Sequence, residues 1–524
     1  RTSRMRITGL CMFKKSSSLP LSFTALTLLA CGSQPPAASS TPATGTSGAV
    51  ASRPAVAGSS AAPSGGGSSA SVPVTSGATL PGTAGGAGSK AVGSTTTATA
   101  GSTGAASAIA GTSAAVAGAP SAGTAAPSGG ISAPTKRAAK FTSLAPPLGM
   151  PLDKSKTGMW SWQDIEGALS RDGSPAGFYY KVSKTGDKNL LIYLVGGGVC
   201  ADGFFCNMNP KNKNESLTAE NVGAGVGNVL GPDQEAQDPS GARWQSGIFK
   251  DDAKNPVKDW NMVFIPYVTG DVFFGSKPNG TVPDVEGTHQ FVGKSNMMKF
   301  LARIVPTFAD AQTVILSGSS AGGIGALLNF TYFADAYIDQ GKGARVLMLD
   351  DAGPFFDDKY LEVCIQKRYR ELYALNESFP ADCPGCTDPS GGKLASGVLN
   401  YLAEKYPEGL LGALVDSDQD EIMKFFFSEG QEDCAYIDNP ITGLLVYPQD
   451  RYPAALKNLL TELVPSAPMR VSTYIWAGDL HQNLFQTATD DRFYQQNGLG
   501  KSVADFVKSL IEGNTPEHLG LLKQ

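Results

Sequence analysis

The sequence predicts an α/β fold with a mainly parallel sheet and helices on both of its faces. From about Lys140 onward, short continuous apolar runs alternate with amphipathic stretches. Apolar runs of this kind are expected of strands that are buried on both faces, as strands of a parallel sheet are. The alternation of such strands with helices therefore favours a parallel sheet over an all-β or all-α architecture.

The predicted elements follow one another in a regular order. Two apolar runs, Leu190–Val195 and Met262–Tyr267, are the first predicted strands, and a helix is expected at Lys294–Phe308, where apolar side chains recur at helical spacing. The later elements are strands at 313–316, 345–349, 410–415 and 472–476, and helices at 321–337, 421–427 and 502–511. Residues 354–408 interrupt this alternation and contain three cysteines, which predicts a disulfide-containing insertion that forms a cap or rim.

The N-terminal residues 1–31 are predicted to be a signal peptide that ends in a lipobox. Residues 12–18 supply a start and a positive region, and the apolar stretch 19–30 is too short to span a bilayer. The stretch ends in Leu-Leu-Ala-Cys-Gly, which resembles a bacterial lipobox with Cys31 as the lipid-bearing residue. We therefore expect an exported cell-envelope lipoprotein of the outer membrane or cell surface. The alternative is a secretory signal in which Cys31 stands by chance.

A long linker is predicted between this signal and the folded domain. Residues 32–138 are dominated by Ala, Gly, Ser, Thr, Pro and Val, and they contain almost no side chains that could build a core. Ordering such a segment would cost conformational entropy without compensating burial, so we expect a disordered linker. The folded domain is then expected at 139–524.

Charge and cysteine usage restrict the class of partner and the compartment. The formal net charge is −5 and the sequence has no basic stripe, which argues against a nucleic-acid partner. Six cysteines follow residue 31, and an even number in an exported protein suggests disulfides. Cys200 and Cys206 are close enough to close a small loop, whereas the other four allow three pairings. The Cys383–Cys386 CxxC pair has no second CxxC partner, so a zinc or redox site is not favoured.

The sharpest chemical signal is the segment Gly318-Ser319-Ser320-Ala321-Gly322. It follows a predicted strand and opens a predicted helix, which is the context that a nucleophile elbow requires. Ser320 occupies the nucleophile position of G-x-S-x-G, and Ser319 does not. An α/β-hydrolase-like fold with Ser320 as nucleophile is the resulting prediction; the alternative is a glycine- and serine-rich turn without chemistry.

A serine nucleophile needs a base, and the chain has three histidines. His289 precedes the elbow and His518 lies in a polar C-terminal tail, whereas His481 follows the last predicted strand. Because this fold keeps the chain order serine, acid, histidine, His481 is the predicted base. The acid is expected in the loop after the preceding strand, where Asp420 is the first choice and Asp418 the second; its role is to orient and stabilise the imidazole.

A glycine-rich segment supplies the predicted oxyanion hole. Gly196-Gly197-Gly198 follows the first strong strand, and in this fold an N–H from that loop joins the N–H after the nucleophile. The predicted donors are Gly197 or Gly198 and Ala321. No dinucleotide-binding glycine pattern follows the segment, so a dinucleotide cofactor is not expected there.

These stretches resemble the pectin acetylesterase and Notum-type carboxylesterase family, most closely its bacterial branch. The resemblance covers roughly residues 158–490 and is carried by the segments 171–175, 194–200, 267–271, 318–323 and 351–353 and the surroundings of His481. It implies an α/β-hydrolase-like fold and the removal of acyl groups from esters without metal or cofactor. The family's triad corresponds to Ser320, Asp420 and His481 in this chain.

The favoured hypothesis is a serine carboxylesterase or acetylesterase, namely a polysaccharide O-deacetylase that acts on an acetylated glycan through an acyl-enzyme. A lipase-like or lipid-deacylating esterase is the first alternative, and a deep apolar pocket would favour it. A catalytically inactive surface-binding module is the second alternative, and the presence of serine, acid and histidine together argues against it. Membrane contact is expected only through the lipid anchor.

Overall fold

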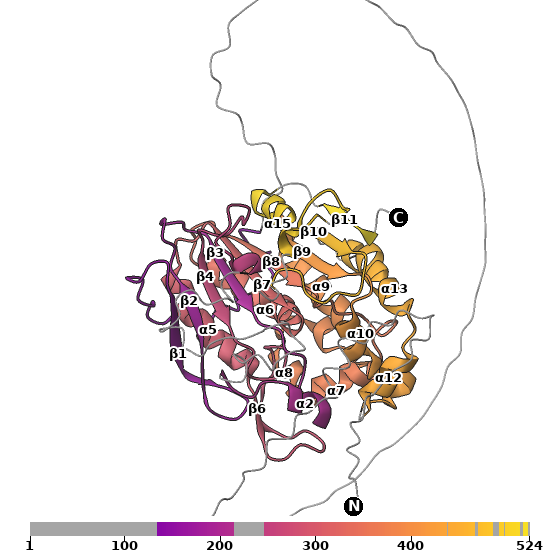
Figure 1. Cartoon of the computed structure of the whole chain (residues 1–524). Coiled ribbons are helices and arrows are strands. Elements are labelled where there is room, and N and C mark those ends of the chain that lie inside the picture. The colour runs from indigo at the N-terminus through magenta and orange to yellow at the C-terminus, as the bar shows by residue number, and fades with distance from the viewer. Residues whose placement is uncertain are drawn as a thin grey trace, which may run out of the picture. The chain divides into compact units, whose positions relative to one another are not determined.

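A nine-stranded sheet forms the centre of the part of the chain that the structure describes (Figure 1). The computed structural model describes residues 134–213, 246–437, 439–466, 470–485, 492–496, 498–513 and 517–521. The sheet has the order β1-β2-β4-β3-β7-β8-β9-β10-β11, in which β1 pairs antiparallel with β2, β2 pairs antiparallel with β4, and the other neighbours are parallel. The predicted α/β-hydrolase-like fold with a mainly parallel sheet is thus confirmed.

The strands of this sheet are β1 (Trp160–Leu169), β2 (Pro175–Lys181), β3 (Leu190–Leu194), β4 (Asn261–Ile265), β7 (Thr313–Ser319), β8 (Arg345–Asp351), β9 (Leu410–Ser417), β10 (Arg470–Trp476) and β11 (His518–Leu519). A separate hairpin consists of β5 (Lys277–Gly280) and β6 (His289–Phe291). Every residue of β3, β4 and β7 is buried, which is why these segments read as unbroken apolar runs.

Helices connect the strands and cover the sheet (Figure 1). They are α2 (Gly203–Met208), α5 (Gly293–Thr307), α6 (Ala321–Ile338), α7 (Val363–Tyr373), α8 (Leu375–Ser378), α9 (Leu394–Lys405), α10 (Glu421–Ser428), α11 (Gln431–Cys434), α12 (Pro440–Val446), α13 (Arg451–Asn458), α14 (Val464–Ser466) and α15 (Val503–Glu512). Short turns of other helix types are η3 (Gly247–Phe249), η4 (Pro384–Thr387), η5 (Leu459–Leu463) and η6 (Arg492–Tyr494). Among the described helices, none is both long enough and apolar enough to cross a membrane.

The sequence pattern did not reveal the antiparallel edge formed by β1 and β2. Only two of the ten residues of β1 are buried, and its charged residues Asp164 and Glu166 are exposed. A half-exposed edge strand has no continuous apolar run, so the criterion that found the central strands does not apply to it.

The segment 354–408 contributes α7, α8, η4 and α9 between β8 and β9. The predicted Cys200–Cys206 disulfide is present. Of the three pairings left open, the structure has Cys364–Cys434, which ties α7 to α11, and Cys383–Cys386, which lies within η4 and its cap. The signal peptide, Cys31 and nearly all of the linker lie outside the described residues.

Removing the Cys364–Cys434 disulfide should cost more stability than removing Cys200–Cys206, because the first closes a much longer loop. The sequence separations are 70 and 6 residues, and loop-closure entropy predicts about 4 and about 2 kcal/mol, respectively. We expect this difference between the double variants C364S/C434S and C200S/C206S in the free energy of unfolding in urea. Equal losses would show that loop length does not control the effect.

Candidate active site

The turn between β7 and α6 holds Ser320 in a strained backbone conformation. Ser320 has φ 56° and ψ −125°, a combination that residues with a side chain rarely adopt and that costs about 1–3 kcal/mol. Its N–H donates to the backbone carbonyl of Asp351 at 2.8 Å, which closes the turn. A Cβ on Gly322 would lie 2.1 Å from the carbonyl oxygen of Leu194, so only glycine fits there. The turn has the sharp strand-to-helix form expected of a nucleophile elbow.

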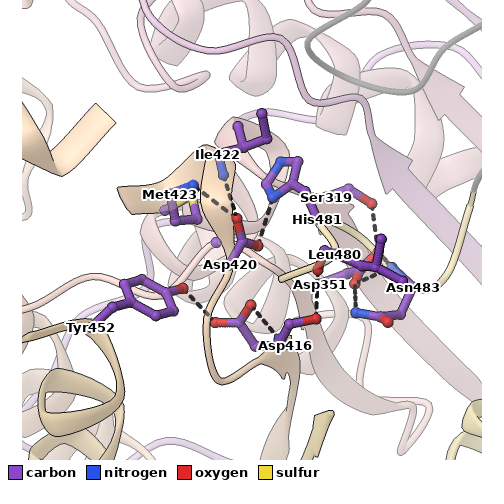
Figure 2. Close-up of polar contacts among 12 residues, drawn as sticks. Ser319, Asp351, Asp416, Asp420, Ile422, Met423, Tyr452, Leu480, His481 and Asn483 are labelled. Carbon is purple, nitrogen blue, oxygen red and sulfur yellow. Dashed lines mark hydrogen bonds and ion pairs between the residues drawn. The ribbon is translucent and has the colours of Figure 1, made fainter. Parts of the chain in front are cut away.

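Asp420 holds the imidazole of His481 (Figure 2). His481 Nδ1 and Asp420 Oδ2 are 2.7 Å apart, and the Asp420 side chain is fully buried. The second oxygen of Asp420, Oδ1, accepts hydrogen bonds from the backbone N–H groups of Ile422 at 3.0 Å and Met423 at 2.8 Å. Asp420 therefore caps the N-terminus of α10 and binds the imidazole at the same time, and the partial positive charge of the helix N-terminus stabilises the carboxylate.

The rival acid, Asp418, has a different role. Its Oδ1 accepts a hydrogen bond from the backbone N–H of Gly478 at 2.9 Å in an exposed contact. Of the two carboxylates that the sequence left open, the structure places Asp420 against the imidazole. The other histidines lie elsewhere in the fold: His289 is in the β5–β6 hairpin, and His518 contacts Thr473 from β11.

The elbow and the loop that carries His481 are joined by the buried carboxylate of Asp351 (Figure 2). Asp351 Oδ2 accepts from the hydroxyl of Ser319 at 2.9 Å and from the backbone N–H of Leu484 at 2.9 Å, and Oδ1 accepts from the N–H of Asn483 at 2.8 Å. One carboxylate thus holds the neighbour of Ser320 and the residues that follow His481. The sequence analysis did not identify this role of Asp351.

Gly196 shows how closely the Ser320 elbow and the loop that carries His481 approach each other. A Cβ atom added to Gly196 would lie 2.9 Å from Ser320 Cβ and 3.2 Å from Nε2 of Gln482. Ser320 and the residue after His481 therefore lie against the same glycine. A larger residue at position 196 would crowd the elbow and the side chain of Gln482.

A second buried carboxyl, Asp416, lies behind Asp420. Asp416 Oδ2 accepts from the hydroxyl of Tyr452 at 2.7 Å, and its Oδ1 accepts from the N–H of Ser417 at 2.8 Å. Burial raises the pKa of Asp416 well above its usual value, and the nearby charge of Asp420 raises it further. This favours the protonated form of Asp416.

A small apolar cavity opens beside Ser320. Its volume is about 30 Å³, and its lining includes Gly198 and Ala321, two of the three predicted oxyanion donors. Gly197 is not part of this lining, and its carbonyl oxygen accepts a hydrogen bond from Asn209 Nδ2 at 2.6 Å. Most of the remaining wall is apolar and comprises Val199, Val272, Ile324, Leu328, Phe355, Leu375, Leu394, Met423, Phe426 and Phe427, with Tyr369.

Asp271 supports one wall of this cavity. Its two oxygens accept from the hydroxyl of Thr269 at 2.6 Å and from the N–H of Gly293 at 2.8 Å, and it fixes a turn in which Val272 and Phe273 have φ of 52° and 59°. Burial raises the pKa of Asp271 to about 6, although its hydrogen bonds act in the opposite direction. Residue Val272 of this turn lines the cavity.

The arrangement can carry out acyl transfer to a serine. It combines a hydroxyl on a strained turn, an imidazole oriented by a buried carboxylate, and backbone N–H groups beside a small cavity. Among the described residues, no group of three or more His, Cys, Asp or Glu side chains is arranged to hold a metal ion.

Comparison with known proteins finds relatives that are named as ester hydrolases. The pectinacetylesterase family model matches residues 155–419, a stretch that includes Ser320 and ends just before Asp420. Palmitoleoyl-protein carboxylesterase notum1 of Xenopus laevis is 32% identical over 192 residues, which are 36% of this chain and 35% of that protein. Pectin acetylesterase 11 of Arabidopsis thaliana is 28% identical over 234 residues, which are 43% of this chain and 53% of that protein.

The matched region thus spans about a third of the Notum-type relative and about half of the plant relative. Human palmitoleoyl-protein carboxylesterase NOTUM is similar over the same length, with 29% identity over 192 residues and 34% of that protein covered.

Replacing Asp351 should loosen the loop that carries His481. Asp351→Ala leaves the buried N–H groups of Asn483 and Leu484 without their acceptor, and each costs about 1–3 kcal/mol. We expect a loss of about 3 kcal/mol or more in the free energy of unfolding and faster amide exchange at Leu484. Ser319→Ala is the matched control, because it removes one donor and should cost about 1 kcal/mol. Unchanged exchange at Leu484 in Asp351→Ala would contradict the bridging role.

Asp271→Asn should flatten the pH dependence of stability between about pH 4 and about pH 6. Since the folded-state pKa is raised from 3.8 to about 6, the folded protein binds the proton more tightly than the unfolded chain. The contribution of Asp271 to the free energy of unfolding is therefore fully present below about pH 4. As the pH rises to about 6, this contribution falls by about 3 kcal/mol. Urea unfolding across this range should show the wild-type advantage over the variant shrinking by that amount. A constant difference would rule out the raised pKa.

Proposed function

The chain belongs to the pectinacetylesterase family, and from this premise we propose that it is an exported serine carboxylic-ester hydrolase that removes acetyl groups from a polysaccharide. The observation that carries the proposal is the 2.7 Å contact between Asp420 and His481 on loops that close against the Ser320 elbow. Because the family match ends at residue 419, the roles of Asp420 and His481 are supported by geometry rather than by the match.

In the proposed reaction, Ser320 Oγ attacks the ester carbonyl and His481 Nε2 takes the hydroxyl proton. The bond from the carbonyl carbon to the sugar oxygen breaks, and His481 delivers the proton to the leaving alcohol, which leaves an acyl group on Ser320. Water then attacks the acyl-enzyme by the same route and releases the carboxylic acid. Asp420 keeps the proton on Nδ1 and stabilises the imidazolium that forms in each step.

The negative charge that develops on the carbonyl oxygen needs hydrogen-bond donors. Backbone N–H groups of Ala321 and of Gly197 or Gly198 are the proposed donors, and the position of Gly198 and Ala321 at the cavity beside Ser320 favours Gly198. The N-terminus of α6 adds a favourable partial positive charge at the same place. Losing one such donor typically costs about 2.7–4 kcal/mol of transition-state stabilisation.

The size and lining of the cavity favour a short acyl group. A volume of about 30 Å³ corresponds to about two water-sized groups, which suits the methyl group of an acetate ester. The apolar walls favour hydrocarbon over a charged or hydroxylated substituent. Acetyl is therefore the acyl group that fits best.

A longer-chain acyl esterase is the second candidate, because the cavity wall is almost entirely apolar. The relatives named palmitoleoyl-protein carboxylesterases are similar to this chain over 36% of its length. Acetate release from acetylated glycans, including pectin, compared with hydrolysis of esters of increasing chain length, separates the two candidates. Preference for long-chain esters with no glycan deacetylation would overturn the first.

Export and anchoring are part of the proposal. The signal-like segment before Cys31 would direct export, and the lipid on Cys31 would retain the enzyme at the cell envelope. The three disulfides of the described residues support export, since disulfides persist in oxidising compartments.

The proposed triad is tested by hydrolysis of p-nitrophenyl acetate. Ser320→Ala and His481→Ala should each lower kcat by about 10⁶-fold, and Asp420→Asn by about 10⁴-fold because the imidazole adopts the wrong tautomer. Asp418→Asn is the matched control and should keep wild-type activity, since its carboxylate contacts Gly478 rather than the imidazole. Equal rates for wild type and Ser320→Ala would leave only the binding-module alternative, and a loss in Asp418→Asn as large as in Asp420→Asn would reject the assignment of the acid.

A further inference from the structure

Phe355 lines two apolar cavities at once. One is the cavity beside Ser320, and the second has a volume of about 40 Å³ and includes Leu399, Leu414 and Val471 in its wall. Phe355 is the residue that belongs to both linings, and its side chain is 7% exposed. Phe355 therefore separates the first cavity from the second.

On each of two helices, one residue lines the first cavity and its neighbour in sequence lines the second. We call the wall between the two cavities at Phe355 the partition. On α6, Leu328 lines the cavity beside Ser320 and Leu327 lines the second cavity. On α9, Leu394 lines the first cavity and Ala395 lines the second. Consecutive residues of each helix thus line different cavities.

We propose that Phe355 sets the acyl-chain length that Ser320 accepts by closing off the second cavity, which would hold the distal part of a longer acyl chain if the side chain at position 355 were smaller. This inference rests on the proposed ester hydrolase function. The occupant is a hydrocarbon chain, because the walls of both cavities are formed mainly by aliphatic and aromatic side chains. The carboxyl of Asp350 also lines the second cavity, and burial raises its pKa, which favours the uncharged form.

Phe355 belongs to the buried core, so replacing it with alanine should lower stability as well as open the partition. Within the described part of the chain, Phe355 makes no aromatic ring contact, whereas Phe356 packs against Phe427 and Tyr452. The far wall of the second cavity includes Leu459 and Leu460 of η5, a short π-helical stretch. Such stretches occur frequently at functional sites.

The first test measures hydrolysis of p-nitrophenyl esters from acetate to octanoate. Phe355→Ala should raise the ratio of kcat/KM for octanoate to that for acetate by about 10-fold or more, since each accommodated methylene contributes a factor of about 10 or more. Ala395→Phe on top of Phe355→Ala refills the second cavity and should return the ratio to the wild-type value. Phe356→Leu is the control for general loosening, because Phe356 lines neither cavity, and should leave the ratio unchanged.

A binding measurement keeps this inference distinct from the proposed function. In a Ser320→Ala background, Phe355→Ala should tighten the binding of octanoate by about 10-fold or more, measured by calorimetry, and Ala395→Phe should cancel the gain. A gain in binding without Ser320-dependent hydrolysis would support the cavity and reject the esterase. Hydrolysis of acetate with no change in chain-length preference or in octanoate binding on Phe355→Ala would overturn the role of Phe355.

Discussion

The active centre depends on the carboxylate of Asp351, which joins two loops that are far apart in the sequence. Asp351 and Ser319 are register partners at the ends of β8 and β7, so their side chains meet as soon as the two strands pair. The same carboxylate accepts the backbone N–H groups of Asn483 and Leu484, some 130 residues further along the chain. The spacing between the elbow and the loop of His481 is therefore fixed by one group that is itself held by the sheet.

Burying carboxyl groups is expensive, and at Asp351 and Asp420 backbone N–H donors offset part of the cost. Asp351 receives two loop N–H groups, and Asp420 receives two N–H groups from the start of α10. Asp416 is satisfied by Tyr452 and by the N–H of Ser417. These acids lie at the carboxyl ends of β8 and β9, where parallel strands bring the following loops together. The parallel sheet thus brings these carboxyl groups close together, and hydrogen bonds from the backbone N–H groups of the loops compensate for their burial.

Part of the cavity wall comes from a segment that carries none of the proposed catalytic groups. Ser320, Asp420 and His481 follow three strands of the sheet, whereas Tyr369, Leu375 and Leu394 of the cavity wall belong to the segment between β8 and β9. A change in that segment can therefore alter the shape of the cavity while the strained elbow and the Asp420–His481 contact remain.

The sequence alone determined the elements whose signal is local. Continuous apolar runs predicted the central strands, and the glycines of the elbow pointed to Ser320, because each pattern reports burial or backbone geometry within a few residues. Chain order made His481 the predicted base. The sequence left Asp418 and Asp420 as alternatives, and it gave no role to Asp351 or Asp416. The contact of Asp420 with His481, the pairing of Cys364 with Cys434, and the two cavities that Phe355 lines depend on which distant segments meet. Tertiary structure decided these points, since hydrogen-bond partners and cavity walls are supplied by residues whose separation in sequence carries no information about their distance in space.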